Sequence, residues 1–330
     1  MFTKHSKIIP LFIIMVLVIA VISILLPDKF LTLINFQSMT SIIPELGLLA
    51  IAMTLSIITG GIDLSIVSIT NLCGVVMALI LTKLGMSGEG TVSTGIIILF
   101  AIVAGLLLSI VCGLLNGFLI SFFGVPPILA TLGTQGLFLG TAVVITTGHG
   151  IFGFPEPFLF IGNGRLGIFP MPFVIFVISI AAIALFLSKT KLGMSMYMLG
   201  SNPIASRFSG IDNEKVVVKT YMITGLLAGI ASIIMISRVN SMRPGYGYAY
   251  LLQAVLIAML AGVDPSGGHG RIIGVIMAII ILQTLQSGFN ILALSPFFRK
   301  FIWGIMLLLA MVINYLVAEN RGRFKKKKSG

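Results

Sequence analysis

The sequence predicts an all-α polytopic integral membrane protein, and its composition and its apolar runs lead to that prediction. Only 9% of the 330 residues are charged and 58% are hydrophobic, whereas a typical soluble domain has about 25% charged residues. Uninterrupted apolar runs reach the roughly 20 residues that a helix needs to cross a bilayer. A membrane β-barrel would instead show strands of about 10 residues with alternating polarity, and the apolar runs here do not alternate.

Apolar runs between helix-breaking residues define ten predicted membrane spans. The run 8–26 follows a basic leader, as in a signal peptide, but it is too long for one and has no small-residue cleavage site. Some runs are short or polar, so eight crossings with broken or re-entrant segments remain an alternative. The predicted spans are 8–26, 40–60, 64–83, 95–122, 128–146, 170–187, 218–237, 251–264, 272–290 and 300–318.

The positions of the basic residues predict the orientation of these spans. Thirteen of the 21 lysines and arginines lie in three regions: before the first span, around the loop that joins the sixth and seventh spans, and after the last span. Such regions stay in the cytoplasm under the positive-inside rule, so both termini are predicted to be cytoplasmic. These residues are Lys4, Lys7, Lys189, Lys191, Arg207, Lys215, Lys219, Arg321, Arg323 and Lys325 to Lys328.

The chain is predicted to form one membrane domain, 1–330, with a cytoplasmic loop at about 188–217 and a basic cytoplasmic tail at 319–330. The longest outer loop, 147–169, is rich in glycine and proline and too short for a separate domain. The chain has no Walker A, H-E-x-x-H or G-x-S-x-G sequence, so we expect no enzyme activity, metal or cofactor. The net charge of +12 lacks a basic-aromatic fold signature, so we expect contact with membrane lipids rather than nucleic acid.

A short amphipathic helix is predicted within the basic loop. Ser201 or Asn202 can cap a helix that begins at Pro203, and Gly210 can end it in the left-handed conformation. Two apolar residues four positions apart then share one face. They are Ile204 and Phe208.

Two further segments share the pattern small-Gly-apolar-Asp-x-Ser, at 60–65 and 261–266. Interrupted segments at corresponding positions of two halves are typical of a transport site between repeats. They are equally consistent with capped loops at the cytoplasmic face, where the predicted topology places both. The count of spans makes the two repeats parallel. The pathway candidates from this pattern are Asp63, Ser65 and Asp264.

Neutral amides form the other candidate pathway lining. Residues spaced by three, four and seven positions share one helical face, and amides bind a polyhydroxylated solute without fixing a charge. They also suit hydrogen bonds between helices. The stripe contains Gln283, Gln286, Ser287 and Asn290, and Asn116 and Gln135 belong to the same class.

Two other patterns carry structural predictions. Small-xxx-small pairs are expected to pack helices within the bundle, and tyrosines at the edge of an apolar run are expected to anchor it at the membrane interface. The pairs are Gly113/Gly117, Gly136/Gly140, Gly225/Gly229 and Gly270/Gly274, and the tyrosines are Tyr246, Tyr248 and Tyr250.

Three parts of the chain carry the motifs of a known family. They read SIITGGIDLS (56–65), GSNPIASRFSGI (200–211), and GGHGRIIG with QSGFNIL (267–274 and 286–292). Together they resemble the permease subunits of bacterial ABC importers of the ribose, xylose, galactose and autoinducer-2 type. The resemblance makes 200–211 the coupling helix on the ATPase, with the residues Asn202, Pro203, Ile204, Ala205, Arg207, Phe208 and Gly210.

The resemblance also implies partners and a location. Two permease subunits would form the channel, two ATP-binding subunits would power it, and a periplasmic or lipid-anchored binding protein would deliver the solute at the bacterial inner membrane. We expect import of a monosaccharide or a related polyhydroxylated solute by alternating access. The alternatives are an ion-coupled secondary transporter that uses Asp63 or Glu45, and a structural or receptor membrane protein.

Overall fold

A computed structural model of the chain describes residues 8–85 and 93–328, with side chains up to residue 314. Within these residues, nine helices are long and apolar enough to cross a membrane, which confirms the all-α polytopic fold. They are α1 (Ile8–Leu25), α3 (Leu33–Ile58), α4 (Ile66–Gly85), α5 (Thr94–Ser121), α6 (Pro127–Thr146), α8 (Met171–Lys189), α11 (Asn213–Val239), α13 (Ile272–Ile291) and α14 (Pro296–Lys328). The shorter helices are α2 (Pro27–Phe30), α7 (Glu156–Asn163), α9 (Lys191–Ser201), α10 (Pro203–Phe208) and α12 (Ala249–Leu260).

The predicted span 251–264 is the one that the structure shortens. It is the 12-residue helix α12, about 18 Å long at 1.5 Å per residue, whereas the hydrocarbon core is about 30 Å thick. Glycines with positive φ stand on both sides of it, Gly247 at +73° and Gly262 at +73°. The backbone turns at these glycines, because other residues resist that conformation. The remaining nine predicted spans correspond to the nine long helices, although α3 begins seven residues earlier than predicted.

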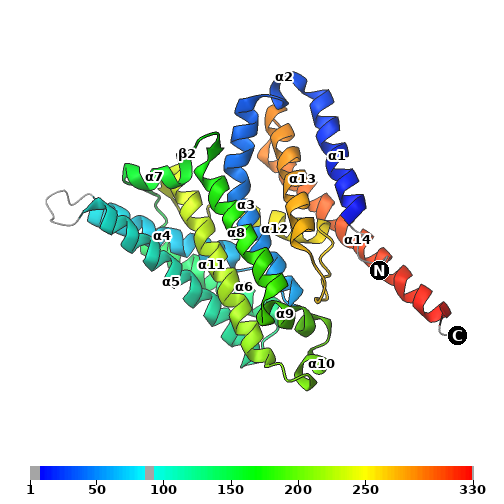
Figure 1. The fold of residues 1–330 in the computed structure, drawn as a ribbon. Helices are drawn as coiled ribbons and strands as arrows, with labels where there is room; N and C mark the ends of the chain where they lie inside the picture. The colour runs from blue at the N-terminus through cyan, green and yellow to red at the C-terminus, as the bar shows by residue number, and fades with distance from the viewer. Residues whose placement is uncertain (1–7, 86–92, 329–330) are drawn as a thin grey trace.

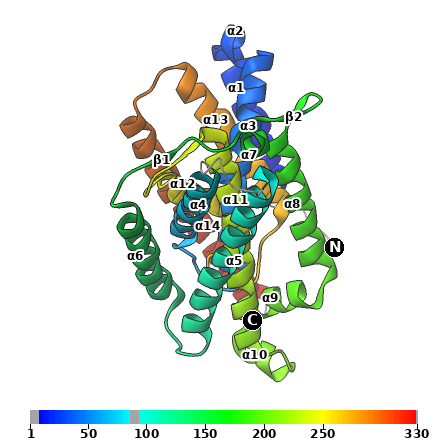
Figure 2. The same cartoon turned by 90° about the vertical axis from the view of Figure 1, so that its left-hand side faces the viewer.

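The centre of the bundle is formed by α3 and α11, with α5, α4 and α12 packed around them (Figures 1 and 2). The helices α5 and α11 approach at backbone distance, because a Cβ built on Gly113 would lie 2.1 Å from the Tyr221 carbonyl oxygen and one on Gly225 2.3 Å from that of Ser109. Packing within the bundle is therefore confirmed for these pairs. The same prediction is wrong for Gly136 and Gly140, because no described atom lies within 4 Å of a Cβ built on either glycine.

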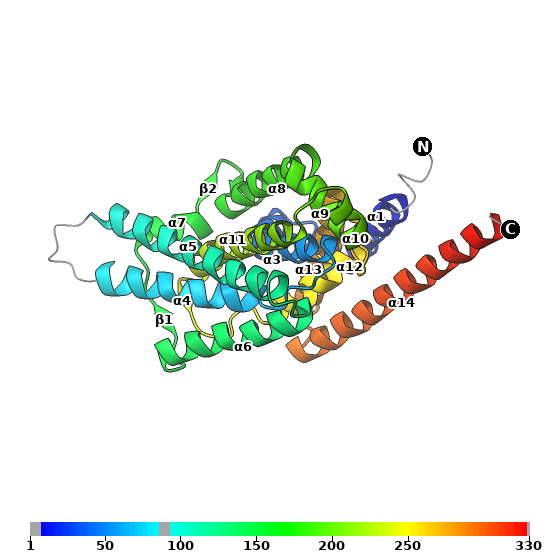
Figure 3. The same ribbon diagram turned by 90° about the horizontal axis from the view of Figure 1, so that it is seen from below.

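The two ends of the bundle carry different connections (Figures 1 and 3). At one end lie α9 and α10. The start of α1 lies at this end, because Ile8 lines the same surface pocket as Tyr197 of α9. The helix α14 returns to this end, because Asn314 donates a hydrogen bond at 2.9 Å to the Met259 carbonyl oxygen, near the end of α12. The described beginning and end of the chain therefore lie on one side, as an even number of crossings before and after the basic loop requires.

The predicted loop 147–169, together with the strand β4 that pairs with it, covers the opposite end of the bundle. Two short antiparallel pairs form there, β1 (Ile151–Phe152) with β4 (Ser241–Met242) and β2 (Arg165–Leu166) with β3 (Phe169–Pro170). Between them α7 docks on the end of α11, where Asn163 Nδ2 donates to the Ser237 carbonyl oxygen at 3.1 Å. This loop is more ordered than its glycine and proline content predicts.

Candidate functional site

The predicted short helix in the basic loop is confirmed as α10. Asn202 rather than Ser201 caps it, because Asn202 Oδ1 accepts hydrogen bonds from the amides of Ile204 and Ala205, both at 3.0 Å. Pro203 is its first residue, and Gly210 follows its end with φ +79°. Local sequence therefore determines both ends of α10.

One face of α10 is apolar and turned away from the protein. Ile204 is 70% exposed and Phe208 is 90% exposed. The helix is nevertheless fixed from behind, because Ser206 Oγ donates to Asn213 Oδ1 at 2.9 Å and Asn213 Nδ2 donates to the Pro203 carbonyl oxygen at 2.8 Å. A rigidly held apolar face of this kind is typical of a docking surface.

Charged pairs brace the connection from α10 to α11. Arg207 pairs with Glu214 at 2.5 Å, and Lys215 pairs with Asp212 at 2.9 Å. Asp212 Oδ1 also accepts from the Lys215 amide and so caps α11. These hydrogen bonds from Lys215 hold the pKa of Asp212 below its ordinary value. The apolar face of α10 is thus bordered by charges that are already paired with one another.

The three motif segments meet at the end of α9. Gly268 donates a backbone hydrogen bond to the Ile58 carbonyl oxygen at 2.8 Å, which joins the loop after α12 to the end of α3. Gly200 lies against both, because a Cβ there would be 1.9 Å from the Ile58 oxygen and 2.4 Å from the Gly268 nitrogen. A Cβ on Gly267 would be 2.9 Å from the Gly60 nitrogen. We call this contact the glycine junction: Ile58, Gly60, Gly200, Gly267 and Gly268.

The glycine junction settles how the two Asp-containing loops are arranged. Both lie at the α9–α10 end, so the two interrupted segments run in parallel, as the count of spans predicts. Only Asp63 is buried, whereas Asp264 is partly exposed. Asp264 Oδ1 accepts from the Ser266 amide within its own loop at 3.0 Å.

Asp63 is the centre of a buried polar network. Its Oδ1 accepts from the Ser65 amide at 3.0 Å and the Ser65 hydroxyl at 2.7 Å, and its Oδ2 accepts from Thr224 of α11 at 3.0 Å. Asn116 of α5 donates to Ser65 Oγ at 2.7 Å and accepts from Thr134 of α6 at 2.6 Å. Burial raises the pKa of Asp63, and the hydrogen bonds from Ser65 and Thr224 oppose that rise. The network ties the start of α4 to α5, α6 and α11.

The amide stripe of α13 points to several neighbours rather than into one site. Gln286 accepts from Gln253 of α12 at 3.2 Å, and Ser287 donates to Asn35 of α3 at 2.7 Å. Asn290 accepts from Arg299 of α14. Gln283 is buried, and no described residue bonds its Oε1. Gln253 belongs with this group, although no spacing pattern in the sequence marks it.

Of the three tyrosines predicted to be interfacial anchors, the prediction is wrong for Tyr250, because its hydroxyl bonds a buried carboxylate; Tyr248 is 50% exposed and stays a predicted anchor, as does Tyr246. Tyr250 Oη donates to Glu45 in the bundle interior at 3.0 Å, and Tyr248 Oη accepts from Gln135 of α6. The Tyr246 carbonyl oxygen accepts from Asn71 of α4 at 2.9 Å. The segment before α12 is therefore tied to the bundle interior through Asn71 and Glu45, while Tyr248 remains half exposed.

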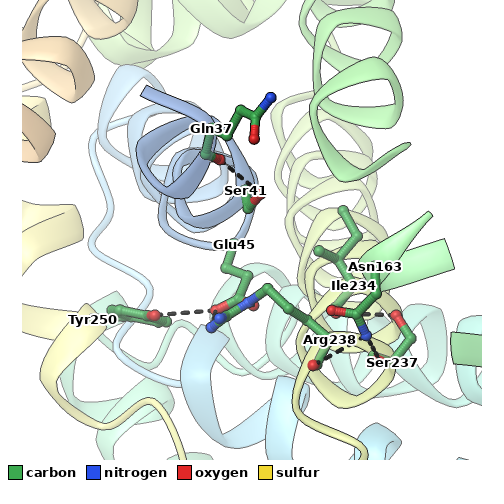
Figure 4. A network of polar contacts seen from close by, with 8 residues as sticks. All are labelled: Gln37, Ser41, Glu45, Asn163, Ile234, Ser237, Arg238 and Tyr250. Atoms are coloured by element: carbon green, nitrogen blue, oxygen red, sulfur yellow. Dashed lines mark hydrogen bonds and ion pairs between the residues drawn. The ribbon is translucent and has the colours of Figure 1, made fainter. Parts of the chain in front are cut away.

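Glu45 forms a buried ion pair with Arg238 (Figure 4). Arg238 Nε donates to Oε1 at 2.5 Å and Nη2 donates to Oε2 at 3.2 Å. With Tyr250, which also donates to Oε2, the pair joins α3, α11 and α12. A carboxylate whose two oxygens are held in this way is already neutralised.

Comparison with known proteins identifies the family. Residues 34–311 match the family model described as the permease component of the branched-chain amino acid transport system. The chain belongs to this permease family. It is a multi-pass membrane permease, and the resemblance of its motifs is confirmed. The description as a component indicates that such permeases work within a transport system.

Curated relatives align along most of this permease. The ribose import permease of Bacillus subtilis (strain 168) is 35% identical over 301 residues, 90% of this chain and 89% of the relative. The D-allose transport system permease of Escherichia coli (strain K12) is 30% identical over 310 residues, 93% and 91% of the two chains. The autoinducer 2 import system permease of Photorhabdus laumondii is 31% identical over 273 residues, 81% and 79%. No solved structure matches the permease.

Proposed function

We propose that this permease is the membrane-spanning subunit of an ATP-driven importer that carries a monosaccharide or a related small polyhydroxylated solute by alternating access. The relatives support the solute class, because their names specify ribose, D-allose and autoinducer 2 as what they import or transport. In this proposal ATP is hydrolysed by separate subunits.

The observation that carries the proposal is α10. Its exposed residues Ile204 and Phe208 form a fixed apolar face on the side of the chain that holds the basic loop. We infer that an ATP-binding subunit docks there, so that this side is cytoplasmic. The proposed coupling residues are Asn202, Pro203, Ile204, Ala205, Arg207, Phe208 and Gly210, within the loop 188–217 of a single membrane domain.

The remaining partners follow from the same assignment. Two ATP-binding subunits, a second permease subunit and a periplasmic or lipid-anchored solute-binding protein would complete the transporter in the bacterial inner membrane. The basic tail 319–330 would contact lipid. Its backbone continues α14 to Lys328, while its side chains and residues 329–330 lie outside the described part of the chain.

The sequence candidates for the pathway divide into groups under this proposal. Some make hydrogen bonds that hold one element to another, and we infer that these position the pathway: Asp63, Ser65, Asn116, Gln286 and Asn290. Asp264 bonds only within its own loop, and we infer that it shapes that loop. Others keep a buried amide oxygen that no described residue bonds, and we infer that these face the solute: Gln135 and Gln283.

The ion-coupled alternative receives no support from the carboxylates. Glu45 is paired with Arg238, and both oxygens of Asp63 accept hydrogen bonds. Reversible ion coupling needs a carboxylate that can exchange its partner during transport. Each of these two instead joins several helices and so contributes to the packing of the bundle.

Reconstitution tests the proposal. The permease is co-expressed with candidate ATP-binding and solute-binding proteins, purified as a complex and placed in proteoliposomes. We expect stable capture of the ATPase, hydrolysis stimulated by the loaded binding protein, and ATP-dependent uptake of D-ribose, D-allose or autoinducer 2. Uptake that continues without an ATPase and follows an imposed ion gradient would overturn it.

A further inference from the structure

Three elements meet where the segment before α12 is tied to the bundle interior. We call residues 243–248 the tyrosine turn. Asn71 of α4 donates to the Tyr246 carbonyl oxygen at 2.9 Å and to the Val67 carbonyl oxygen at 2.8 Å. Gln135 of α6 donates to the Tyr248 hydroxyl. The turn is therefore tied to both α4 and α6.

Several buried polar atoms where α4, α6 and the tyrosine turn meet have no hydrogen-bond partner among the described residues. Among the described residues, none bonds Ser68 Oγ, Asn71 Oδ1 or Gln135 Oε1, although these side chains are 1%, 1% and 8% exposed. Ser68 lies three positions before Asn71, so both are on one face of α4. Buried polar groups almost always find partners, and several unpaired atoms in one place indicate a site that receives them from elsewhere.

The neighbouring Asp63 network provides the contrast. There Asp63, Ser65, Asn116 and Thr134 satisfy one another within the same helices α4, α5 and α6. The chain can therefore build a closed hydrogen-bond network at this interface. Three and six residues after Ser65, at Ser68 and Asn71, and at Gln135 directly after Thr134, it does not, which distinguishes a binding site from a brace.

The site lies inside the membrane-spanning part of the bundle. Asn71 is five residues after the start of α4 and Gln135 eight residues after the start of α6, about 8 and about 12 Å at 1.5 Å per residue. The tyrosine turn reaches them from the opposite end, after α11 and β4, and runs into α12 at Tyr250, which points at Glu45 (Figure 4). Non-helical backbone at such depth is tolerated only where protein buries it or a water-filled cavity adjoins it.

The chemistry of the site is that of a receptor for hydroxyl groups. Two amide oxygens accept hydrogen bonds, and a serine hydroxyl both donates and accepts. None of Ser68, Asn71, Gln135 and Tyr248 carries a charge at neutral pH. These four side chains offer no counter-charge to a charged solute, whereas an uncharged polyol supplies the donors that the amide oxygens need.

We propose that Ser68, Asn71 and Gln135, with Tyr248, form a solute-binding station of the translocation pathway, which takes an uncharged polyhydroxylated molecule. This rests on the proposed function, since it assigns the step at which such a solute passes through the membrane. Asn71 and Gln135 hold the tyrosine turn with their amide nitrogens and contact the solute with their oxygens. Ser68 bonds no described protein group, so its hydroxyl contacts only the solute.

Cysteine labelling tests whether water and solute reach the site. Ser68→Cys is made in a chain whose own thiols are removed by Cys73→Ala and Cys112→Ala, and is treated in proteoliposomes with a membrane-impermeant methanethiosulfonate reagent. We expect labelling that depends on the nucleotide state and is slowed at least fivefold by the sugar that the complex transports. The control is Ser109→Cys, since the Ser109 hydroxyl is buried and bonds only its own helix, at Leu106; it should stay unlabelled.

Ser68→Ala supplies the second measurement. Within the described chain its hydroxyl bonds no protein group, so a purely structural role leaves assembly, stability and uptake unchanged. We expect normal assembly and ATPase with uptake reduced about two- to tenfold, the effect of one lost hydrogen bond. Ser109→Ala should keep full uptake.

The outcomes separate the two proposals. Absence of uptake by the unsubstituted complex refutes the proposed function itself. Normal uptake by that complex, together with a Ser68→Cys thiol that is unlabelled in every nucleotide state or labelled without protection by the sugar, refutes the binding station alone. Water without solute at this site would give that last result.

Discussion

The glycine junction makes Gly200→Ala the most informative substitution. The new Cβ would lie 1.9 Å from the Ile58 oxygen, and ordinary contact begins at 3.4 Å, so the two backbones must separate by about 1.5 Å. That separation breaks the 2.8 Å hydrogen bond from Gly268 to Ile58. Overpacking costs about 1–3 kcal/mol and the buried backbone bond about 1–3 kcal/mol more, while alanine gains about 1 kcal/mol in helix propensity. The net loss is therefore about 1–5 kcal/mol.

Gly136→Ala is the matched control. Gly136 is also helical, in α6, but no described atom lies within 4 Å of its built Cβ. We expect a gain of up to about 1 kcal/mol there. Equilibrium unfolding of the two variants in mixed micelles measures the difference. Equal stabilities would show that the three motif segments do not meet as described.

Three further substitutions examine other parts of the structure. Phe208→Asp should leave membrane insertion intact and reduce uptake about tenfold or more per ATP hydrolysed; unchanged transport would contradict the coupling assignment. Arg238→Ala should destabilise the fold by about 3–5 kcal/mol because Glu45 is left as a buried unpaired charge, and adding Glu45→Gln should recover part of the loss; equal unfolding of the single and double variants would refute the ion pair. Thr224→Val removes a hydrogen bond to Asp63 and should cost about 1–3 kcal/mol in the same assay, and no loss would remove Thr224 from the network.

Hydropathy predicted the long helices well because the bilayer constrains them strongly. In hydrocarbon every backbone polar group must be satisfied within its own helix, so a span needs a long apolar run that the sequence displays directly. The 251–264 run met that criterion by composition. The prediction of a full span there is wrong because the chain turns at Gly262, just after α12 ends at Leu260. Hydropathy does not detect this turn, since apolar residues on both sides of it average to the same value as a continuous helix.

Site residues divide according to the range of the interactions that define them. The cap at Asn202 uses amides two and three residues away, so the sequence predicts it. The pair of Glu45 with Arg238 joins residues 193 positions apart, and the sequence contains no sign of it. Tyr250 was misassigned because an amphipathic ring at the edge of an apolar run looks the same whether its hydroxyl meets water or a buried carboxylate.

The glycine junction connects the coupling arm with the proposed solute station. Gly200 at the end of α9 touches the end of α3 and the loop before α13 at the same point. Since the two interrupted segments run in parallel, one displacement of α9 and α10 acts on both in the same direction. The loop after Ile58 leads through Asp63 and Ser65 into α4, which carries Ser68 and Asn71 within its first two turns. Because the Asp63 network holds that start to α5, α6 and α11, we expect a push on α10 to tilt α4 about this fixed point, which moves Ser68 and Asn71 relative to Gln135 and so opens or closes the station.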